Sequence, residues 1–113
     1  MEKLFSYGTL QQPDVQMATF GRVLAGVADT LLGYRVTTVK IADVQAIALS
    51  GKEYHPMLVY TGYPSDKISG MVFELTPEEL IQADAYEDAI YARKLGRMLS
   101  GGQAWIYADV NDL

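Results

Sequence analysis

Two stretches, far apart in the chain, carry residue types that could do chemistry. The first directly follows the apolar residues Leu4 and Phe5, and it consists of Tyr7, Gly8, Thr9 and Leu10. A strand that ends in a tight glycine turn presents backbone N–H groups that can bind an anion. The second, residues 84–93, supplies a carboxylate where a solvent-facing helix would not need one. Together they indicate a candidate site built from main-chain donors and an acid.

The first stretch needs a strand and a helix to position it. Residues 3–6 read as a strand, and residues 13–20 read as a short helix that begins at Pro13 and stops at Gly21. Proline at the first helical position and glycine just after the last are the expected signals. The sequence therefore predicts a strand, a loop and a helix in succession.

Strand signals follow in the middle of the chain. Residues 22–40 are rich in Val, Leu and Thr and are punctuated by Gly26 and Gly33, which predicts two strands or one long bent strand. A further strand pair is expected at residues 46–50 and 57–61, around a turn at 51–54. Another strand is expected over residues 68–75.

The second stretch is positioned by a helix with a clear start signal. Thr76 can cap this helix while Glu79 reaches back to the Thr76 N–H, and Pro77 takes the first helical position. We expect the helix to run from residue 77 to about residue 87. A hairpin should follow, with strands 91–99 and 104–110 joined by a turn that contains two glycines. Many strands and two short helices predict an α+β fold, a small mixed β-barrel or strongly curled sheet.

On the expected helix, two acids share the apolar side. At about 100° per residue, one side carries Leu80, Ala83, Asp84 and Glu87, and the other carries Glu78, Glu79 and Gln82. Moving an unpaired carboxylate out of water costs several kcal/mol or raises its pKa. Three interpretations of these two acids stay open. Glu87 reaches solvent at the fraying helix end, one of the acids forms a structural ion pair with Arg93, or one of them is part of a functional site.

Composition excludes several classes of function. The 113 residues include no cysteine and one histidine, so the sequence excludes disulfides and thiolate metal sites and disfavours an ordinary zinc site. The net charge of −5 and the dispersed Lys and Arg residues lack the footprint of a nucleic-acid binder. Without an export signal or a membrane span, we expect a single cytoplasmic domain over residues 1–113.

The ordered set of motifs resembles the gamma-glutamylcyclotransferase family, in its small AIG2-like branch. Family members carry a loop of tyrosine, glycine, serine or threonine, and leucine after the first strand. They also carry an acidic motif, then a tyrosine and an arginine two residues apart, then an aromatic strand. The chain matches with residues 7–10, residues 84–87, Tyr91 and Arg93, and Trp105 with Tyr107. It departs from the pattern at Asp88, where glycine is common, and at Ala83, where a larger aliphatic residue is usual.

The resemblance implies a mixed barrel and an enzyme of the lyase or acyltransferase type that needs no metal or cofactor. Such an enzyme cleaves a γ-glutamyl amide by attack of the substrate's own α-amine on its γ-carbonyl, releasing 5-oxoproline and an amine. Glu87 matches the catalytic glutamate, the residue 7–10 loop matches the substrate-holding loop, and Tyr91 is placed at the site. The expected partner is a small γ-glutamyl substrate, with no nucleic acid or membrane, and the protein is expected to be a monomer or weak homodimer.

This chemistry asks for a partly buried acid. Transfer of a proton from an α-ammonium of pKa near 8 to a glutamate of pKa about 4.3 costs roughly 5 kcal/mol. A glutamate pKa raised to about 6 or 7 by burial would reduce that cost to roughly 1 to 3 kcal/mol. Two other functions stay open: a non-catalytic small-molecule-binding or regulatory domain of the same fold, and a structural domain whose strand around Trp105 packs on another protein. The lone His55 is expected to have a structural or solvent role.

Overall fold

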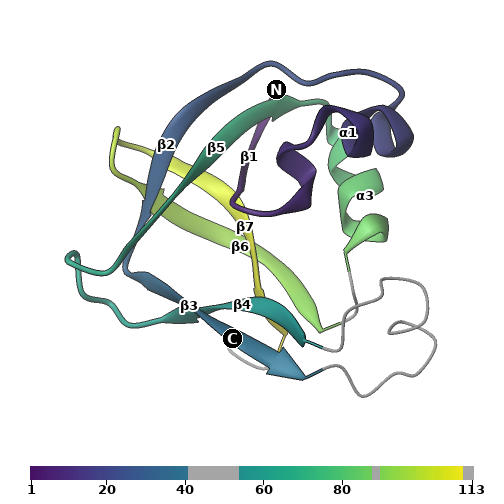
Figure 1. Ribbon diagram of the computed structural model, residues 1–113. Coiled ribbons are helices and arrows are strands. Elements are labelled where there is room, and N and C mark those ends of the chain that lie inside the picture. The colour runs from purple at the N-terminus through teal and green to yellow at the C-terminus, as the bar shows by residue number, and fades with distance from the viewer. Residues whose placement is uncertain (41–53, 88–89, 111–113) are drawn as a thin grey trace.

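The computed structural model describes residues 1–40, 54–87 and 90–110 (Figure 1). Their helices and strands follow one another along the chain in this order: β1 (Glu2–Ser6), the 3-10 turn η1 (Thr9–Gln11), α1 (Pro13–Phe20), β2 (Gly26–Leu32), β3 (Tyr34–Lys40), β4 (Tyr54–Tyr60), β5 (Lys67–Leu75), α3 (Pro77–Tyr86), β6 (Tyr91–Met98) and β7 (Gln103–Asp109).

Within these ranges, five strands close into a barrel in the order β1, β5, β2, β6, β7. Neighbouring strands are antiparallel except at the seam, where β1 and β7 pair in parallel through Leu4 and Trp105. The β6–β7 hairpin turns through Gly101 and Gly102, which have φ values of 107° and 75°. The α+β fold with a small mixed barrel is therefore confirmed, as is the C-terminal hairpin.

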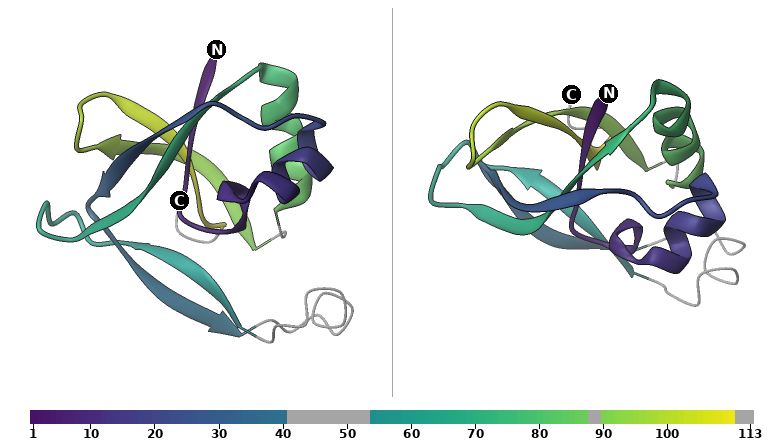
Figure 2. Two further views of the ribbon diagram at one scale, coloured as in Figure 1. Left: turned by 45° about the horizontal axis from the view of Figure 1, so that its top comes forward. Right: turned by 90° about the horizontal axis from the view of Figure 1, so that it is seen from above.

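Strands β3 and β4 form a separate two-stranded ribbon that extends away from the barrel (Figure 2). The break between β2 and β3 falls at Gly33, whose φ of 81° favours glycine, so residues 22–40 do contain two strands. Strand β4 pairs along its length with β3, a pairing that the sequence did not predict. Residues 46–50 and 51–53 lie outside the described residues. The carbonyl of Gly33 accepts the N–H groups of Thr61 and Gly62, which fixes this pairing at the base of the ribbon.

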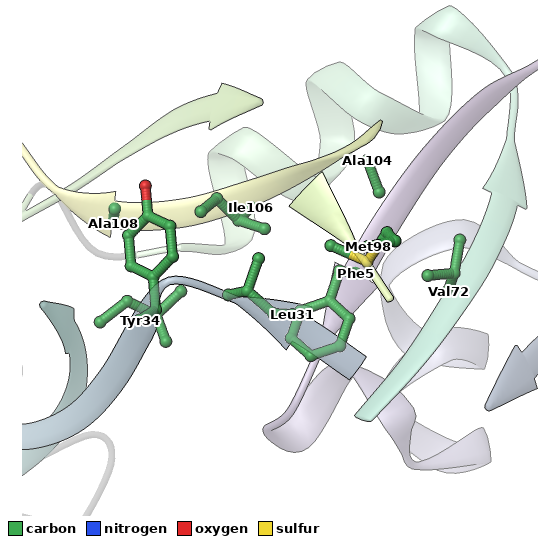
Figure 3. Close-up of a cluster of buried hydrophobic side chains, with 9 residues drawn as sticks. Phe5, Leu31, Tyr34, Val72, Met98, Ala104, Ile106 and Ala108 are labelled. Carbon is green, nitrogen blue, oxygen red and sulfur yellow. The ribbon is translucent and has the colours of Figure 1, made fainter. Parts of the chain in front are cut away.

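Buried apolar side chains form two layers, one inside the barrel and one outside it. Figure 3 shows the inner layer, in which side chains from β1, β2, β5, β6 and β7 meet Tyr34 at the start of the ribbon. The outer layer lies between the barrel and the helices, and its buried members are Leu4, Leu10, Leu24, Phe73, Leu75, Leu80, Ala83 and Tyr107. Alternation along the strands explains both layers, since successive side chains point to opposite faces of a sheet.

Helices α1 and α3 lie together on one side of the barrel (Figure 1). Helix α1 has the predicted bounds, and it ends at Gly21 with a φ of 74°. Helix α3 begins with the predicted capping box, in which Thr76 Oγ1 accepts the Glu79 N–H at 3.1 Å and Glu79 Oε1 accepts the Thr76 N–H at 2.9 Å. Its last residue is Tyr86, and Glu87 is its C-cap.

One acid of α3 lies where the helical pattern did not place it. Glu79 was expected on the solvent side, but it is buried. Its two carboxylate oxygens accept hydrogen bonds from Arg22 Nε and Nη2 at 2.7 and 2.8 Å. The capping box bends this side chain back toward the helix start, where the segment after α1 supplies the cation. The periodicity alone could not show this partner.

Candidate functional site

The residue 7–10 loop is not the tight glycine turn expected from the sequence. Gly8 has a φ of −123°, and the chain then enters η1, where the carbonyls of Gly8 and Thr9 accept the N–H groups of Gln11 and Gln12. The Gly8 N–H donates to Ser6 Oγ at 3.3 Å. A 3-10 turn leaves its first N–H groups, here those of Thr9 and Leu10, without a partner inside the turn. The loop can therefore still offer main-chain donors to an anion.

Open space borders the glycine of this loop. A Cβ atom placed on Gly8 would meet no heavy atom of the described chain within 4 Å. The absence of a side chain leaves the backbone accessible to a ligand, which suits a loop that binds through its main chain.

The side chain of Leu10 anchors the loop. It is 3% exposed and belongs to the outer apolar layer. Its carbonyl accepts a hydrogen bond from Gln16 Nε2 at 2.8 Å, and Gln16 Oε1 accepts the Leu24 N–H at 2.8 Å. Gln16 therefore connects the loop, α1 and the start of the next strand segment. The role of Gln16 was not predicted, because a glutamine on a short helix carries no local sign of burial.

Glu87 lies close to the loop at the C-terminal end of α3. The Thr9 Oγ1 and Tyr86 hydroxyl oxygens are 2.7 Å apart and share a hydrogen bond, so the loop is joined to the residue that precedes Glu87. The Glu87 N–H donates to the Ala83 carbonyl at 3.1 Å, and the residue is partly buried. Burial, followed by the charge of Glu87, raises the pKa of Tyr7 to about 12. The charge of Glu87 thus acts on the Tyr7 phenol, and Thr9 contacts the side chain of the residue before Glu87.

The other acid on this side of α3, Asp84, forms the ion pair with Arg93 that was one of the open readings. Arg93 donates from Nε to Asp84 Oδ1 at 2.8 Å and from Nη2 to Oδ2 at 3.0 Å, and the Tyr107 hydroxyl donates to Oδ1 at 2.7 Å. Burial by itself raises the pKa of Asp84, but the hydrogen bonds from Arg93 and Tyr107 outweigh it, and the pKa is lowered. Asp84 is therefore ionised at neutral pH and fixed in position.

Tyr107 connects the two acids electrostatically. Burial raises its pKa first, followed by its hydrogen bond to Asp84 and the charges of Asp84 and Glu87. The phenol consequently keeps its proton and serves as a donor.

A pocket of about 280 Å³ opens beside Asp84, and its lining residues are Asp84, Tyr91, Arg93, Trp105 and Tyr107. Tyr91 is the predicted site residue in this lining, whereas among the described residues neither Glu87 nor the residue 7–10 loop forms part of it. The Tyr91 hydroxyl donates to the Pro56 carbonyl at 2.5 Å, which joins β6 to the ribbon. The pocket and the loop are thus separate places, with Asp84 and Glu87 three residues apart on α3.

Two further features, a metal-binding cluster and a membrane-spanning helix, are absent from the described part of the chain. No group of three or more His, Cys, Asp or Glu side chains there could hold a metal ion. None of the helices described is both long and apolar enough to cross a membrane.

Comparison with known proteins gives a family and a fold. Residues 4–111 match the model of a family described as gamma-glutamyl cyclotransferase, AIG2-like. Comparison with curated proteins gives no match.

Two solved structures from Arabidopsis thaliana are similar to this chain. The solution structure of At3g28950.1 matches with a TM-score of 0.75 and 22% sequence identity, and the match covers 97% of this chain. That of At5g39720.1 has a TM-score of 0.74 and 23% identity, over 99% of this chain. The chain spans 62% of the first protein and 70% of the second. At these identities the likeness shows the fold.

Proposed function

Because the chain belongs to the AIG2-like gamma-glutamyl cyclotransferase family, we propose that it cleaves γ-glutamyl amides, releasing 5-oxoproline and an amine. The observation that supports this most strongly is that Glu87, the C-cap of α3, directly follows Tyr86, whose hydroxyl shares a hydrogen bond with Thr9 in the loop after β1. The loop offers main-chain donors, and the glutamate offers a carboxylate that can take up and return a proton.

In the proposed reaction the substrate's glutamyl group lies against the residue 7–10 loop, with its α-amine directed at Glu87. Glu87 removes a proton from the α-ammonium, and the amine nitrogen attacks the γ-carbonyl carbon, forming a C–N bond and a tetrahedral intermediate. The C–N bond of the original amide then breaks as Glu87 donates the proton to the departing nitrogen. The ring nitrogen gives up its remaining extra proton to the departing amine, which leaves as an ammonium ion. The products are therefore 5-oxoproline and a protonated amine, and Glu87 is again a carboxylate.

The nucleophile and the electrophile belong to one substrate molecule, so the protein mainly has to hold that molecule in the reactive conformation. Holding the glutamyl chain folded back on itself supplies the proximity that otherwise costs entropy. The anchors of the loop suit this task, because Gln16 holds the Leu10 carbonyl and Tyr86 holds the Thr9 side chain. We therefore expect a preformed site with Tyr7, Gly8 and Thr9 in contact with substrate and Leu10 as support.

The test is an assay of 5-oxoproline after incubation with a panel of γ-glutamyl amino acids and γ-glutamyl amines. We expect turnover by the unaltered chain and a loss of about 10²- to 10⁴-fold in Glu87→Gln, because this variant keeps the shape but cannot accept the proton. Glu78→Gln is the matched control, since Glu78 is an exposed acid on the same helix. It should retain activity.

Each other outcome has a clear meaning. Full turnover in a folded Glu87→Gln protein would reject the role of this glutamate. Saturable binding of γ-glutamyl ligands without any 5-oxoproline would reject the enzyme and favour a small-molecule-binding domain of the same fold.

A further inference from the structure

Resting on this proposed function, we infer that the pocket beside Asp84 receives the departing amine as an amino acid, and that Arg93 binds its carboxylate. The pocket would then select γ-glutamyl amino acids over γ-glutamyl amines that lack an acid group. Arg93 would be a specificity-determining residue for the leaving group.

The strand register explains why the pocket has an aromatic floor. The residues on either side of Tyr107, Ile106 and Ala108, belong to the inner apolar layer (Figure 3). Arg93 lies directly across from Tyr107 in the β6–β7 pair, so both point to the outer face. Trp105, two residues before Tyr107, shares that face, and α3 supplies Asp84 as the wall. The pocket is thus a fixed product of two paired strands and a helix.

Arg93 is held so that one edge of its guanidinium remains for a ligand. The ion pair with Asp84 uses Nε and Nη2, which leaves the edge formed by Nη1 and the second Nη2 proton outside that pair. Such an edge matches a carboxylate with two parallel hydrogen bonds. The guanidinium carbon lies 4.6 Å from the centre of the Trp105 ring, and Trp105 Nε1 donates to Glu2 Oε2 at 3.0 Å. The indole therefore keeps the cation in place.

Under this proposal, the departing group of the substrate lies in this pocket. Thr9 in the substrate loop contacts Tyr86, Glu87 follows Tyr86, and Asp84 is one helical turn before Glu87. A substrate with its glutamyl end on the loop and its amide nitrogen at Glu87 would extend its remaining atoms toward Asp84. The volume of about 280 Å³ holds about nine groups the size of a water molecule, which is sufficient for a small amino acid.

The charges of the chain do not draw a carboxylate to this pocket from a distance. The chain carries a net charge of −5, so it does not attract anions from a distance. Asp84 also offsets the charge of Arg93, and its own side chain is 38% exposed. Recognition must therefore depend on direct hydrogen bonds to the guanidinium edge, a contact that only a substrate already in the pocket can make.

The experiment compares γ-glutamylalanine with γ-glutamylethylamine, which differ only in the carboxylate of the departing group. We expect the unaltered chain to show at least tenfold higher kcat/KM for γ-glutamylalanine. In Arg93→Met that preference should disappear, through a fall in kcat/KM for γ-glutamylalanine alone. If Arg93→Met does not fold, Arg93→Lys is the alternative variant. Because lysine lacks the planar guanidinium edge, most of the preference for γ-glutamylalanine should be lost in this variant too.

The Asp84→Asn variant distinguishes recognition of the substrate carboxylate by Arg93 from a purely structural role of the Asp84–Arg93 ion pair. It breaks the same ion pair but leaves Arg93 in place, so the preference for γ-glutamylalanine should persist or increase. Equal kcat/KM for both substrates in the unaltered chain would overturn this inference while leaving the cyclotransferase proposal intact. Equal losses for both substrates in the Arg93 variants would also overturn it, since a structural role predicts that result. If neither substrate, nor any in the wider panel, yields 5-oxoproline, the proposed function itself fails.

Discussion

At the scale of single residues, Gln16 shows how a polar side chain can organise a site from a distance. It is 1% exposed, and its amide group satisfies the Leu10 carbonyl and the Leu24 N–H together. A buried backbone group that loses its partner costs about 1–3 kcal/mol. Gln16 therefore stabilises the fold and fixes how the loop leaves the barrel.

We expect Gln16→Leu to lower the free energy of unfolding by about 2 kcal/mol, since it leaves two buried backbone groups without a partner. Urea unfolding followed by Trp105 fluorescence would measure the change. Gln82→Leu on the exposed surface of α3 is the matched control and should change stability little. A Gln16→Leu protein as stable as the unaltered chain would show that water or a rearranged loop satisfies both groups.

The acids of α3 show which residue roles could be read from the sequence. The tyrosine, acid and arginine motifs make Glu87 the proposed catalytic acid. An ion pair between Arg93 and one of the two acids was among the sequence interpretations, and Asp84 forms it. Glu79 was misplaced because Arg22, its partner, is 57 residues away in the chain and carries no local signal of the contact. A helical pattern reports the face of a residue, but not where a long side chain bends.

At the scale of elements, α3 is held at both ends. Its first turn is fixed by the capping box and by the Arg22–Glu79 ion pair, and its last residue, Tyr86, contacts Thr9. Any loosening of the helix start would also shift Glu87 at its end. The stability of this helix is thus coupled to the geometry of the candidate site.

The ion pair of Glu79 predicts a pH dependence. Hydrogen bonds from Arg22, opposed by burial and aided by Thr76, lower the pKa of Glu79 from 4.5 to about 2. Between these values the unfolded chain binds more protons, so the contribution of the carboxylate is complete above about pH 4.5 and is lost as the pH falls toward 2. We expect the free energy of unfolding to decrease across this range, and to decrease less in Glu79→Gln.

Urea titrations at several pH values between 2 and 6 would measure this difference. Glu78→Gln is the control, because Glu78 is exposed on the same turn and should leave the acid dependence nearly unchanged. Parallel curves for the unaltered chain and Glu79→Gln would contradict the expectation.

Helices and strands that carry local sequence signals were predictable, but which strands pair with each other was less so. Both helices were expected with nearly the observed bounds, because proline, threonine and glycine mark helix ends within a few residues. The pairing of β4 with β3 was missed, since strands carry no signal that names their neighbour. The loop after β1 was expected to turn tightly at Gly8, but Gly8 has a φ of −123° and a 3-10 turn over the next residues reverses the chain.

At the scale of the whole molecule, the narrow barrel requires close strand packing. A Cβ atom on Gly70 in β5 would overlap the Ser6 carbonyl oxygen and lie 2.7 Å from Phe5 Cζ. The Ser6 oxygen belongs to the backbone and cannot rotate away. Glycine at this position is therefore a consequence of the approach of β1 to β5.

We expect Gly70→Ala to destabilise the fold by about 2 kcal/mol through overpacking. Thermal and urea unfolding would measure it, with Ser69→Ala on the exposed side of the same strand as control. If Gly70→Ala is as stable as Ser69→Ala, then β1 must be able to move outward without loss. The barrel would then be wider and more adaptable than its backbone contacts indicate.

The seam between β1 and β7 determines when the barrel can be completed. Leu4 pairs with Trp105, so one edge of the first strand has no neighbour until the last described strand has been made. A ribosome delivers the chain from its N-terminus, and an unpaired strand edge invites association with other chains. The pocket beside Asp84 shares this delay, because β7 supplies Trp105 and Tyr107 to its lining. A nascent chain halted before β7 would therefore expose the unpaired edge of β1, which can associate with other chains, and would lack part of the pocket. Docking of β7 would complete both the barrel and the pocket.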